Sequence, residues 1–138
     1  MTKSEAREIL FTLVFEAEFN PEKSASEIYE IAKEERGFEN FRYIKKALEY
    51  IVANRNELVS MIESHSEEWN FSRMSAATRA VLLIGTYDMK IKNLAPDIAI
   101  NEAVNLSKKY DEDSAYPFVN GVLNSVKDAP VLSAADEE

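Results

Sequence analysis

The sequence predicts an all-α protein. Apolar residues recur at intervals of three and four along most of the chain, which is the period of a helix and not the alternation of a strand. Only three glycines and four prolines interrupt the 138 residues, of which 46% are hydrophobic. At this length we expect one domain of about seven helices over residues 1–128. Residues 129–138 are acidic and aperiodic, and are expected to form a flexible tail.

The N-terminal segment predicts a helix from Thr2 to about Glu18. Thr2 and Glu5 have the spacing of a capping box. The apolar residues form two stripes: Ile9, Leu10, Leu13, Val14 and Ala17, and beside them Phe11 and Phe15. Together the stripes cover more of the helix than a surface helix needs, so this helix is expected to be central. A short second helix around Ile28 is expected to end near Gly37, which suits a left-handed cap.

The middle of the chain predicts a long helix followed by an enclosed one. Residues 40–64 follow a three-four repeat that is interrupted at Arg55, which favours a single helix with a bend near "ANRN". The segment "EEWNFSRMS" predicts a short helical turn or an irregular corner. Ser75 is a suitable N-cap for a fifth helix, in which Leu82 and Leu83 widen the apolar arc. This fifth helix is therefore expected to be enclosed.

The last third predicts two more helices. Pro96 breaks the chain before a sixth helix, whose apolar stripe ends at Tyr110. The segment "PFVNGVLNSV" contains Asn-Gly, a hairpin signal, but its apolar residues follow helical steps. We therefore expect a seventh helix with Gly121 inside it. Its core stripe is expected to be Val119, Leu123 and Val126, and its edge Phe118, Gly121 and Val122.

Composition excludes several classes of protein. The chain has no cysteine, so a disulfide framework and a thiolate zinc site are excluded. The absence of a bilayer-spanning apolar segment and of a basic signal sequence predicts a cytoplasmic protein with no membrane contact. The net charge of -9 argues against non-specific nucleic-acid binding. Basic residues still gather in four places, each most simply a solvated helix face: Arg42-Lys45-Lys46, Arg73 with Arg79, Lys90-Lys92 and Lys108-Lys109.

The residues do not assemble a catalytic, metal or cofactor site. The single histidine, His65, lies at a predicted helix end without a partner suited to catalysis. The adjacent carboxylates of Asp111, Glu112 and Asp113 stand in a polar connector, where such groups are normally solvated. We therefore expect no enzyme and no cofactor. On these grounds alone the chain is a helical binding or assembly module.

Three segments resemble the NusB family of transcription antitermination factors. "IAINEAVNLSKKY" followed by "EDSAYPFVNGVLNSV" resembles the signature of that family. Upstream, "REILFTLVFE" is similar to its first helix, and "WNFSRMSAATRAVLLIGTYDM" resembles its W-x-x-x-R corner and R-A-x-L motif. The resemblance covers nearly the whole chain. It implies that residues 1–128 form a NusB-like RNA-binding domain with two helical subbundles packed around the N-terminal helix.

The resemblance also implies a function. NusB proteins bind the boxA element of ribosomal RNA transcripts together with NusE, a ribosomal small-subunit protein that doubles as a transcription factor. The assembly modifies RNA polymerase so that it reads through terminators, and no catalysis is involved. A second possibility stays open at this point. The alternative is a protein-only helical adaptor that docks on a ribosomal or polymerase protein through an apolar edge.

The resemblance places an RNA site at seven positions: Lys3, Arg7, Arg79, Asp113, Phe118, Asn120 and Gly121. Arg7 matches the family's basic N-terminal segment and Arg79 a basic position at the start of the fifth helix. Both are expected to be surface charges that contribute little to folding. Phe118 is the aromatic of the F-V-N-G motif, whereas Asp113 lies near an acidic position whose charge opposes RNA binding.

Two positions depart from the family pattern. Leu83 stands where an arginine is usual after the R-A-x-L motif. Asp111 replaces the common glycine that ends the sixth helix. Aspartate tolerates left-handed geometry better than most residues, so we expect Asp111 to take over that cap.

Overall fold

The computed structural model describes residues 1–64 and 68–129, and these ranges contain helices but no strand. His65 and residues 130–138 of the expected tail lie outside the described residues. The helices are α1 (Lys3–Phe19), α2 (Ala25–Arg36), α3 (Arg42–Ala53), α4 (Arg55–Glu63), the 3-10 helix η1 (Phe71–Arg73), α5 (Ala76–Lys90), α6 (Pro96–Tyr110) and α7 (Ala115–Val126). The prediction of an all-α fold with about seven helices is confirmed.

Local capping signals set most helix ends. The Thr2 hydroxyl accepts a hydrogen bond from the backbone N–H of Glu5 at 3.0 Å, and the Glu5 carboxylate accepts one from the N–H of Thr2 at 2.7 Å. This is the expected capping box of α1. Gly37 ends α2 with a φ of 68°, the left-handed geometry that glycine adopts without a steric penalty. Ser75 caps α5 and Pro96 is the first residue of α6, so these predictions are also confirmed.

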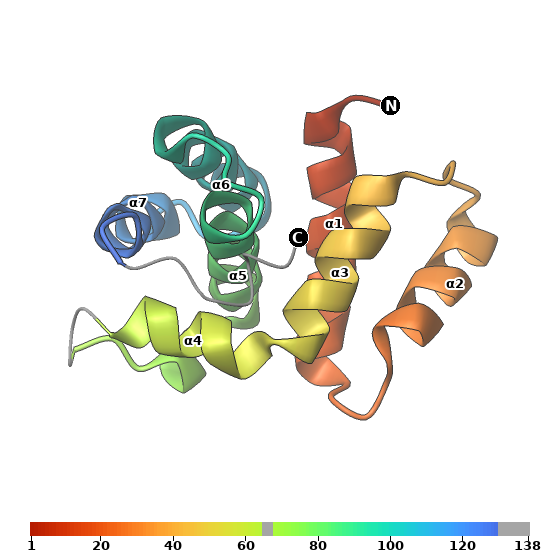
Figure 1. Ribbon diagram of the computed structural model, residues 1–138, viewed down its shortest axis with the longest axis horizontal. Helices are drawn as coiled ribbons and strands as arrows, with labels where there is room; N and C mark the ends of the chain where they lie inside the picture. Colours follow the sequence, from red (N-terminus) through yellow and green to blue (C-terminus); the bar gives the residue numbers. More distant parts are fainter. Residues whose placement is uncertain (65–67, 130–138) are drawn as a thin grey trace.

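The expected long helix over residues 40–64 is two helices. The break falls at Asn54, whose backbone has left the helical region at φ -119°, ψ 27°. The carbonyl oxygen of Tyr50 accepts both the backbone N–H of Asn54 at 2.8 Å and its side-chain amide at 3.1 Å, so Asn54 closes the end of α3. After the break, α4 runs in a different direction from α3 (Figure 1). The expected change of direction is present, but the prediction of one continuous helix is wrong.

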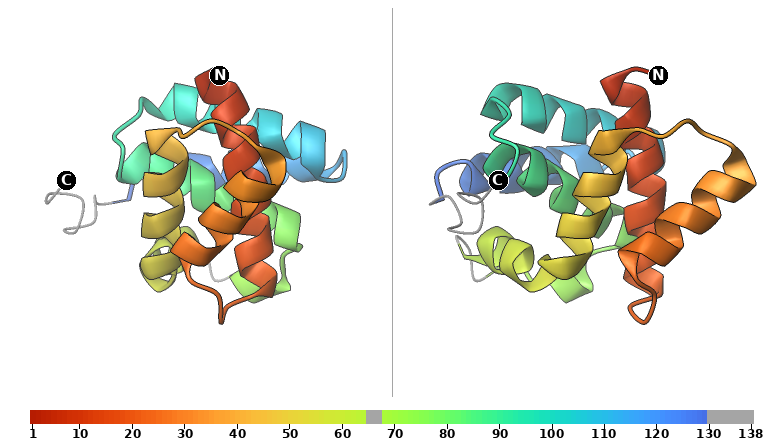
Figure 2. Two further views of the ribbon diagram at one scale, coloured as in Figure 1. Left: turned by 90° about the vertical axis from the view of Figure 1, so that its right-hand side faces the viewer. Right: turned by 45° about the vertical axis from the view of Figure 1, so that its right-hand side comes forward.

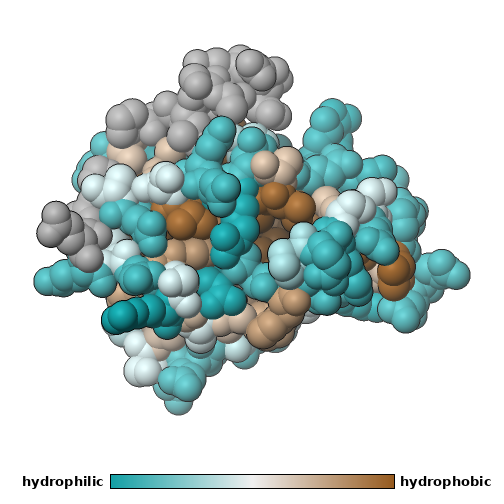
Figure 3. All heavy atoms as spheres, turned by 90° about the horizontal axis from the view of Figure 1, so that it is seen from below, coloured by the Kyte–Doolittle hydropathy of each residue, from teal (hydrophilic) through white to brown (hydrophobic). Residues whose placement is uncertain are grey.

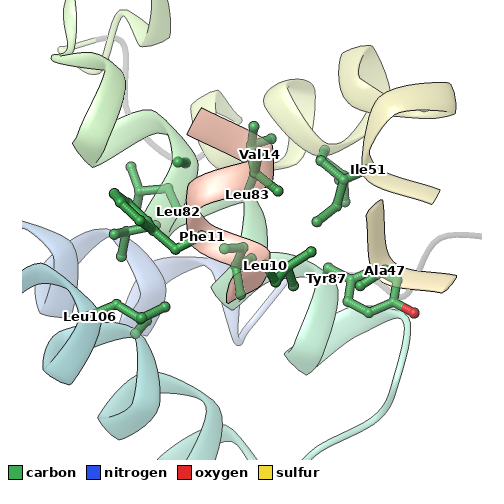
Figure 4. Close-up of a cluster of buried hydrophobic side chains, with 14 of the residues drawn as sticks. Leu10, Phe11, Val14, Ala47, Ile51, Leu82, Leu83, Tyr87 and Leu106 are labelled. Atoms are coloured by element: carbon green, nitrogen blue, oxygen red, sulfur yellow. The ribbon is translucent and has the colours of Figure 1, made fainter. Parts of the chain in front are cut away.

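Helix α1 lies between two groups of helices (Figures 1 and 2). It packs against α2 and α3 on one side and against α5 and α6 on the other, while α5 also contacts α4 and α7. Figure 4 shows Leu10, Phe11 and Val14 of α1 between side chains of α3 and those of α5 and α6. All three are buried, and so is nearly the whole of α5. The two subbundles around the N-terminal helix are thus confirmed.

Gly85 lets α5 lie close to its neighbours. A Cβ atom at this position would lie 2.7 Å from Cδ1 of Leu123 on α7 and 3.2 Å from Cβ of Ala103 on α6. The first contact is shorter than real Cβ atoms make, so a side chain at this position would force the Leu123 side chain to change conformation and Ala103 to move away slightly. The glycine therefore sets the spacing of α5, α6 and α7.

Lys90 holds the end of α7. Its ammonium group donates to the carbonyl oxygens of Lys127 at 2.9 Å and Ala129 at 2.6 Å, and the residue is 5% exposed. Burial lowers the pKa of Lys90. The charge is tolerated because it satisfies carbonyl groups that the helix end leaves without partners.

The outer surface is mainly polar. The face seen from below is mostly hydrophilic, with hydrophobic residues in separated patches (Figure 3). Within the described residues, no helix is long and apolar enough to cross a membrane.

Candidate nucleic-acid interface

The seven expected site positions fall into two groups. Lys3 and Arg7 belong to the first turns of α1, whereas the remaining positions lie on α5, on α7 and between α6 and α7. Arg79 bonds to Glu18 near the other end of α1. Along a helix that rises 1.5 Å per residue, Glu18 is about 16 Å from Arg7. The structure therefore does not bring all seven positions together.

Arg7 is a buried structural cation. It is 5% exposed, and its Nε donates to Asp88 of α5 at 2.8 Å. The Tyr43 hydroxyl donates to the other Asp88 oxygen at 2.9 Å, and the Arg7 guanidinium stacks 5.2 Å from the Tyr43 ring centre. Burial raises the pKa values of Asp88 and Tyr43. The expectation that Arg7 is a surface charge is wrong, while its part in RNA binding stays a prediction.

Arg79 is also engaged by an acid. Its Nε donates to Glu18 at 2.7 Å and its Nη1 to the carbonyl oxygen of Met74 at 2.7 Å. Arg55 donates twice to the same Glu18 carboxylate, at 2.8 and 2.9 Å. Burial alone would raise the pKa of Glu18, but the bonds from Arg55 and Arg79 outweigh it and leave the pKa below its usual value. The guanidinium of Arg79 thus ties α5 to α1.

The start of α7 exposes an aromatic ring. Phe118 is 39% exposed and meets the Trp69 ring edge-on, with ring centroids 6.3 Å apart. Val119, Leu123 and Val126 are buried as expected. Val122 is buried too, so its expected place at the edge is wrong. The reason is geometric: Val122 comes three residues after Val119 and four before Val126, so it lies on the same face of the helix as they do, toward the core.

Gly121 leaves the surface of α7 open on the same side as the Phe118 ring. Among the described residues, nothing lies within 4 Å of where its Cβ would be. Asn120 is exposed next to it, and its carbonyl oxygen accepts a bond from the Asn124 side chain at 2.9 Å. A groove of about 570 Å³ between α6 and α7 adjoins this face, lined by Ile100, Asn101, Val104, Tyr116, Asn120 and Asn124 among others. The arrangement offers an exposed ring, amides and bare backbone to a ligand.

The connector between α6 and α7 is held by Asp111. Its backbone is extended, at φ -115° and ψ 179°, so the expected left-handed cap is wrong. Its carboxylate instead accepts hydrogen bonds from the hydroxyl of Thr78 and from the N–H of Glu112. These bonds fix the extended conformation and tie the connector to α5. Asp113 is exposed in the same connector, as an RNA-opposing charge requires.

Sequence reasoning did not find the acids that hold the two arginines. Asp88 and Glu18 are almost fully buried in the structure. One feature of the sequence did point to an ion pair: Asp88 is an acid within a mainly apolar helix. A carboxylate buried there needs a partner. Nothing in the sequence indicated which cation supplies it.

The site defines a helical binding protein. In the ranges 1–64 and 68–129, no group of three or more potential ligands could hold a metal ion. The NusB family model matches residues 4–128, so the chain belongs to the NusB family. Transcription antitermination protein NusB of Clostridium novyi is 35% identical over 131 residues, which are 91% of this chain and 98% of the relative. The Clostridium acetobutylicum protein of the same name is 34% identical, covering 91% and 95%.

Solved structures agree with the family. T. maritima NusB superposes with a TM-score of 0.84 at 22% identity, covering 100% of this chain and 99% of that one, which shows the shared fold. A crystal structure of NusB and NusE in complex with double-stranded RNA matches with a TM-score of 0.81 and 26% identity, covering 94% of this chain and 100% of that one. Membership confirms the resemblance and the prediction that the protein is not an enzyme.

Proposed function

We propose that this protein is a transcription antitermination factor that binds boxA RNA of ribosomal RNA transcripts together with NusE. The assembly joins the RNA polymerase antitermination complex in the cytoplasm and promotes read-through. The names of the curated relatives support this proposal, and so does the similarity to a NusB that was crystallised with NusE and RNA. We further propose that residues 1–128 form the RNA-binding domain, in line with the family match to residue 128.

The observation that carries the proposal is the exposed Phe118 beside the open backbone of Gly121. Single exposed apolar side chains are common and Phe19 is more exposed, so the proposal depends on the Phe118 ring and the open backbone of Gly121 lying on the same edge of α7. A nucleotide base can stack on such a ring, and a helix face without a side chain lets the ribose and phosphate approach. Asn120 is exposed on the neighbouring face of α7 that turns toward α6, where its amide is available for hydrogen bonding to a base edge.

The charged residues of the proposed site have different roles, because some are exposed and others are already paired with carboxylates. Lys3 is exposed and contacts RNA directly. Arg7 and Arg79 already bond to carboxylates, so they act by holding α1 and α5 in place and by balancing buried negative charge. Asp113 is exposed near the proposed RNA path and limits the affinity by repulsion.

The test is a titration of fluorescein-labelled boxA RNA with the full chain, in the presence and absence of NusE. We expect weak binding by the chain alone, because of its net charge, and clearly tighter binding with NusE. Linkage requires RNA to tighten NusE binding by the same factor. Equal RNA affinity with and without NusE would contradict cooperative assembly, and NusE binding without any RNA binding would favour the protein-only adaptor.

A further inference from the structure

A basic hollow lies at the end of the molecule where α1 and α3 begin and α5 ends. It encloses about 510 Å³ and is lined by Lys3, Phe41, Arg42, Tyr43, Lys46, Tyr87, Ile91, Lys92 and Asn93. Figure 2 shows that α1 and α3 start at the same end of the molecule. Four of the nine lining residues are cations and none is acidic, in a chain whose net charge is -9. The excess of negative charge therefore lies elsewhere on the protein.

The four cations come from three distant segments of the chain. Arg42 and Lys46 are one turn apart on the same face of α3, and the fold brings Lys3 and Lys92 to them. All four are exposed. In the part of the chain that the structure describes, none of the four forms an ion pair within 4 Å. The sequence suggested solvated helix faces, and the fold gathers exposed cations from three such segments around one hollow.

No acid lines the hollow, and of the acids near it in the chain only Glu49, exposed on α3 three residues after Lys46, has no bond within the described residues, since Glu5 belongs to the capping box of α1. The Asp88 carboxylate is buried and bonds to Arg7 and Tyr43. Glu39 accepts a bond from the amino group of Met1 at 2.7 Å. The positive charge of the hollow is thus available to a ligand that brings its own negative charge.

The rest of the lining suits a ligand with flat rings as well as charges. Phe41 is half-buried at the rim, and the Tyr43 ring lies below Lys3, whose ammonium group is 5.6 Å from the ring centre. Phe41 is also the N-cap of α3 and supplies no side-chain hydrogen bond to the first turn, which contains no acid. The positive end of that helix dipole therefore adds to the field of the cations.

We propose that this basic hollow binds the phosphate backbone of single-stranded RNA, as a contact surface additional to the one around Phe118. The proposal rests on the proposed function, because it concerns the same RNA ligand. A single strand carries one negative charge per nucleotide and turns its bases outward, which matches several cations around a half-buried aromatic ring. An acidic peptide would match the charge but would leave the ring without a stacking partner.

The test compares Lys46→Gln/Lys92→Gln with the parent protein in the NusE-containing complex, over a salt series. Each phosphate contact on a single strand contributes about 0.7 to the slope of log K against log salt. Loss of two contacts should lower the slope by about 1.4, which is about 25-fold weaker binding at 0.1 M salt if both proteins bind equally at 1 M. The loss should be the same for boxA and for a strand of permuted sequence, because phosphates carry no sequence information.

Lys45 provides the matched control. It is exposed on α3 beside Lys46, but its ammonium group faces the Tyr29 ring at 5.8 Å and does not line the hollow. Lys45→Gln should bind RNA nearly as the parent does, whereas Lys46→Gln should not. In the parent complex, RNA should protect Lys46 and Lys92 from acetylation and leave Lys45 reactive.

Three results would overturn the inference. If the parent binds boxA but the double variant keeps its salt slope, the hollow is not an RNA contact and the proposed function still stands. If the double variant loses affinity for NusE without RNA, the hollow is a protein contact. If the parent does not bind RNA with NusE present, the proposed function fails and this inference fails with it.

Discussion

Arg7 and Asp88 form a buried ion pair of 2.8 Å between α1 and α5, although 81 positions separate them in the sequence. The side chains are 7% and 2% exposed, so water contributes little to their solvation. Tyr43 of α3 completes the group by donating to the same carboxylate. A residue that the family resemblance assigns to RNA therefore also connects the two halves of the fold.

Arg7→Ala should destabilise the protein strongly. Removal of the guanidinium leaves the Asp88 carboxylate buried without its cation, and such losses cost about 3–5 kcal/mol. Urea unfolding followed by circular dichroism measures the change. Arg7→Ala/Asp88→Asn should recover part of the loss, because the uncompensated charge is gone. Lys3→Ala, at an exposed position of the same helix, should leave the free energy of unfolding within about 0.5 kcal/mol of the parent value.

Glu18→Gln should reduce stability at neutral pH and much less in acid. The pKa of Glu18 is held below the ordinary 4.5, so its charged form stabilises the fold above that pH, and the contribution is lost as pH falls through the folded value. Loss of its charge-assisted bonds to Arg55 and Arg79 should cost about 1–3 kcal/mol at pH 7.

Urea midpoints at pH 7, 5, 4 and 3 measure the difference between Glu18→Gln and the parent. The difference should narrow steadily toward pH 3. Glu16→Gln is the control, since its carboxylate is half-exposed and pairs with Lys23 at 3.5 Å only. A difference that stays constant over the whole series would show that the Glu18 charge does not stabilise the fold.

Phe118→Ala should separate binding from stability. The ring is 39% exposed, so its removal should cost well under the 3–5 kcal/mol of a core phenylalanine. Loss of a stacked base should weaken RNA binding with NusE by about 1–3 kcal/mol. Leu123→Ala, on the buried side of the same helix, should instead cost about 2–5 kcal/mol of folding stability. A Phe118→Ala protein with parental RNA affinity would remove this ring from the site.

The two helical glycines should respond to alanine in opposite directions. Gly121→Ala places a methyl group in open space and should raise stability by about 0.5–1 kcal/mol through helix propensity. Gly85→Ala meets the Leu123 side chain at 2.7 Å and Ala103 at 3.2 Å, and the repacking that this forces among three buried helices should outweigh the same gain in propensity. Melting temperatures of both variants check this. If RNA approaches the bare backbone, Gly121→Ala should also bind boxA less tightly.

Asp113→Asn should strengthen RNA binding with NusE. The carboxylate is exposed in the connector before α7 and outside the core, so its removal takes away a repulsive charge without disturbing the packing. Fluorescence anisotropy at 0.1 M and 0.5 M salt should show the gain mainly at the lower concentration, because salt screens exposed charges. An unchanged affinity would place Asp113 away from the RNA path.

Features that depend on neighbours in the sequence were predictable. The capping box of Thr2 and Glu5, the left-handed Gly37 and the start of α6 at Pro96 each follow from a few adjacent residues. Helical periodicity also identified the seventh helix despite its Asn-Gly pair. The exposed edge at Phe118 followed from the same periodicity.

Features that depend on distant partners were not predictable from one sequence. No local pattern shows that Arg7 meets Asp88, or that the hydroxyl of Thr78 fixes Asp111 in an extended conformation. At the break, the backbone N–H and the side chain of Asn54 both donate to the Tyr50 carbonyl oxygen, which the apolar repeat does not reveal.

The place of α1 between the two halves has a consequence for synthesis on the ribosome. The face of α1 that meets α5 has no cover until residue 88 leaves the exit tunnel. At about 5–20 residues per second, the 81 residues after Arg7 take roughly 4–16 s to make. For that time the nascent chain exposes to chaperones the apolar face of α1 that α5 later covers.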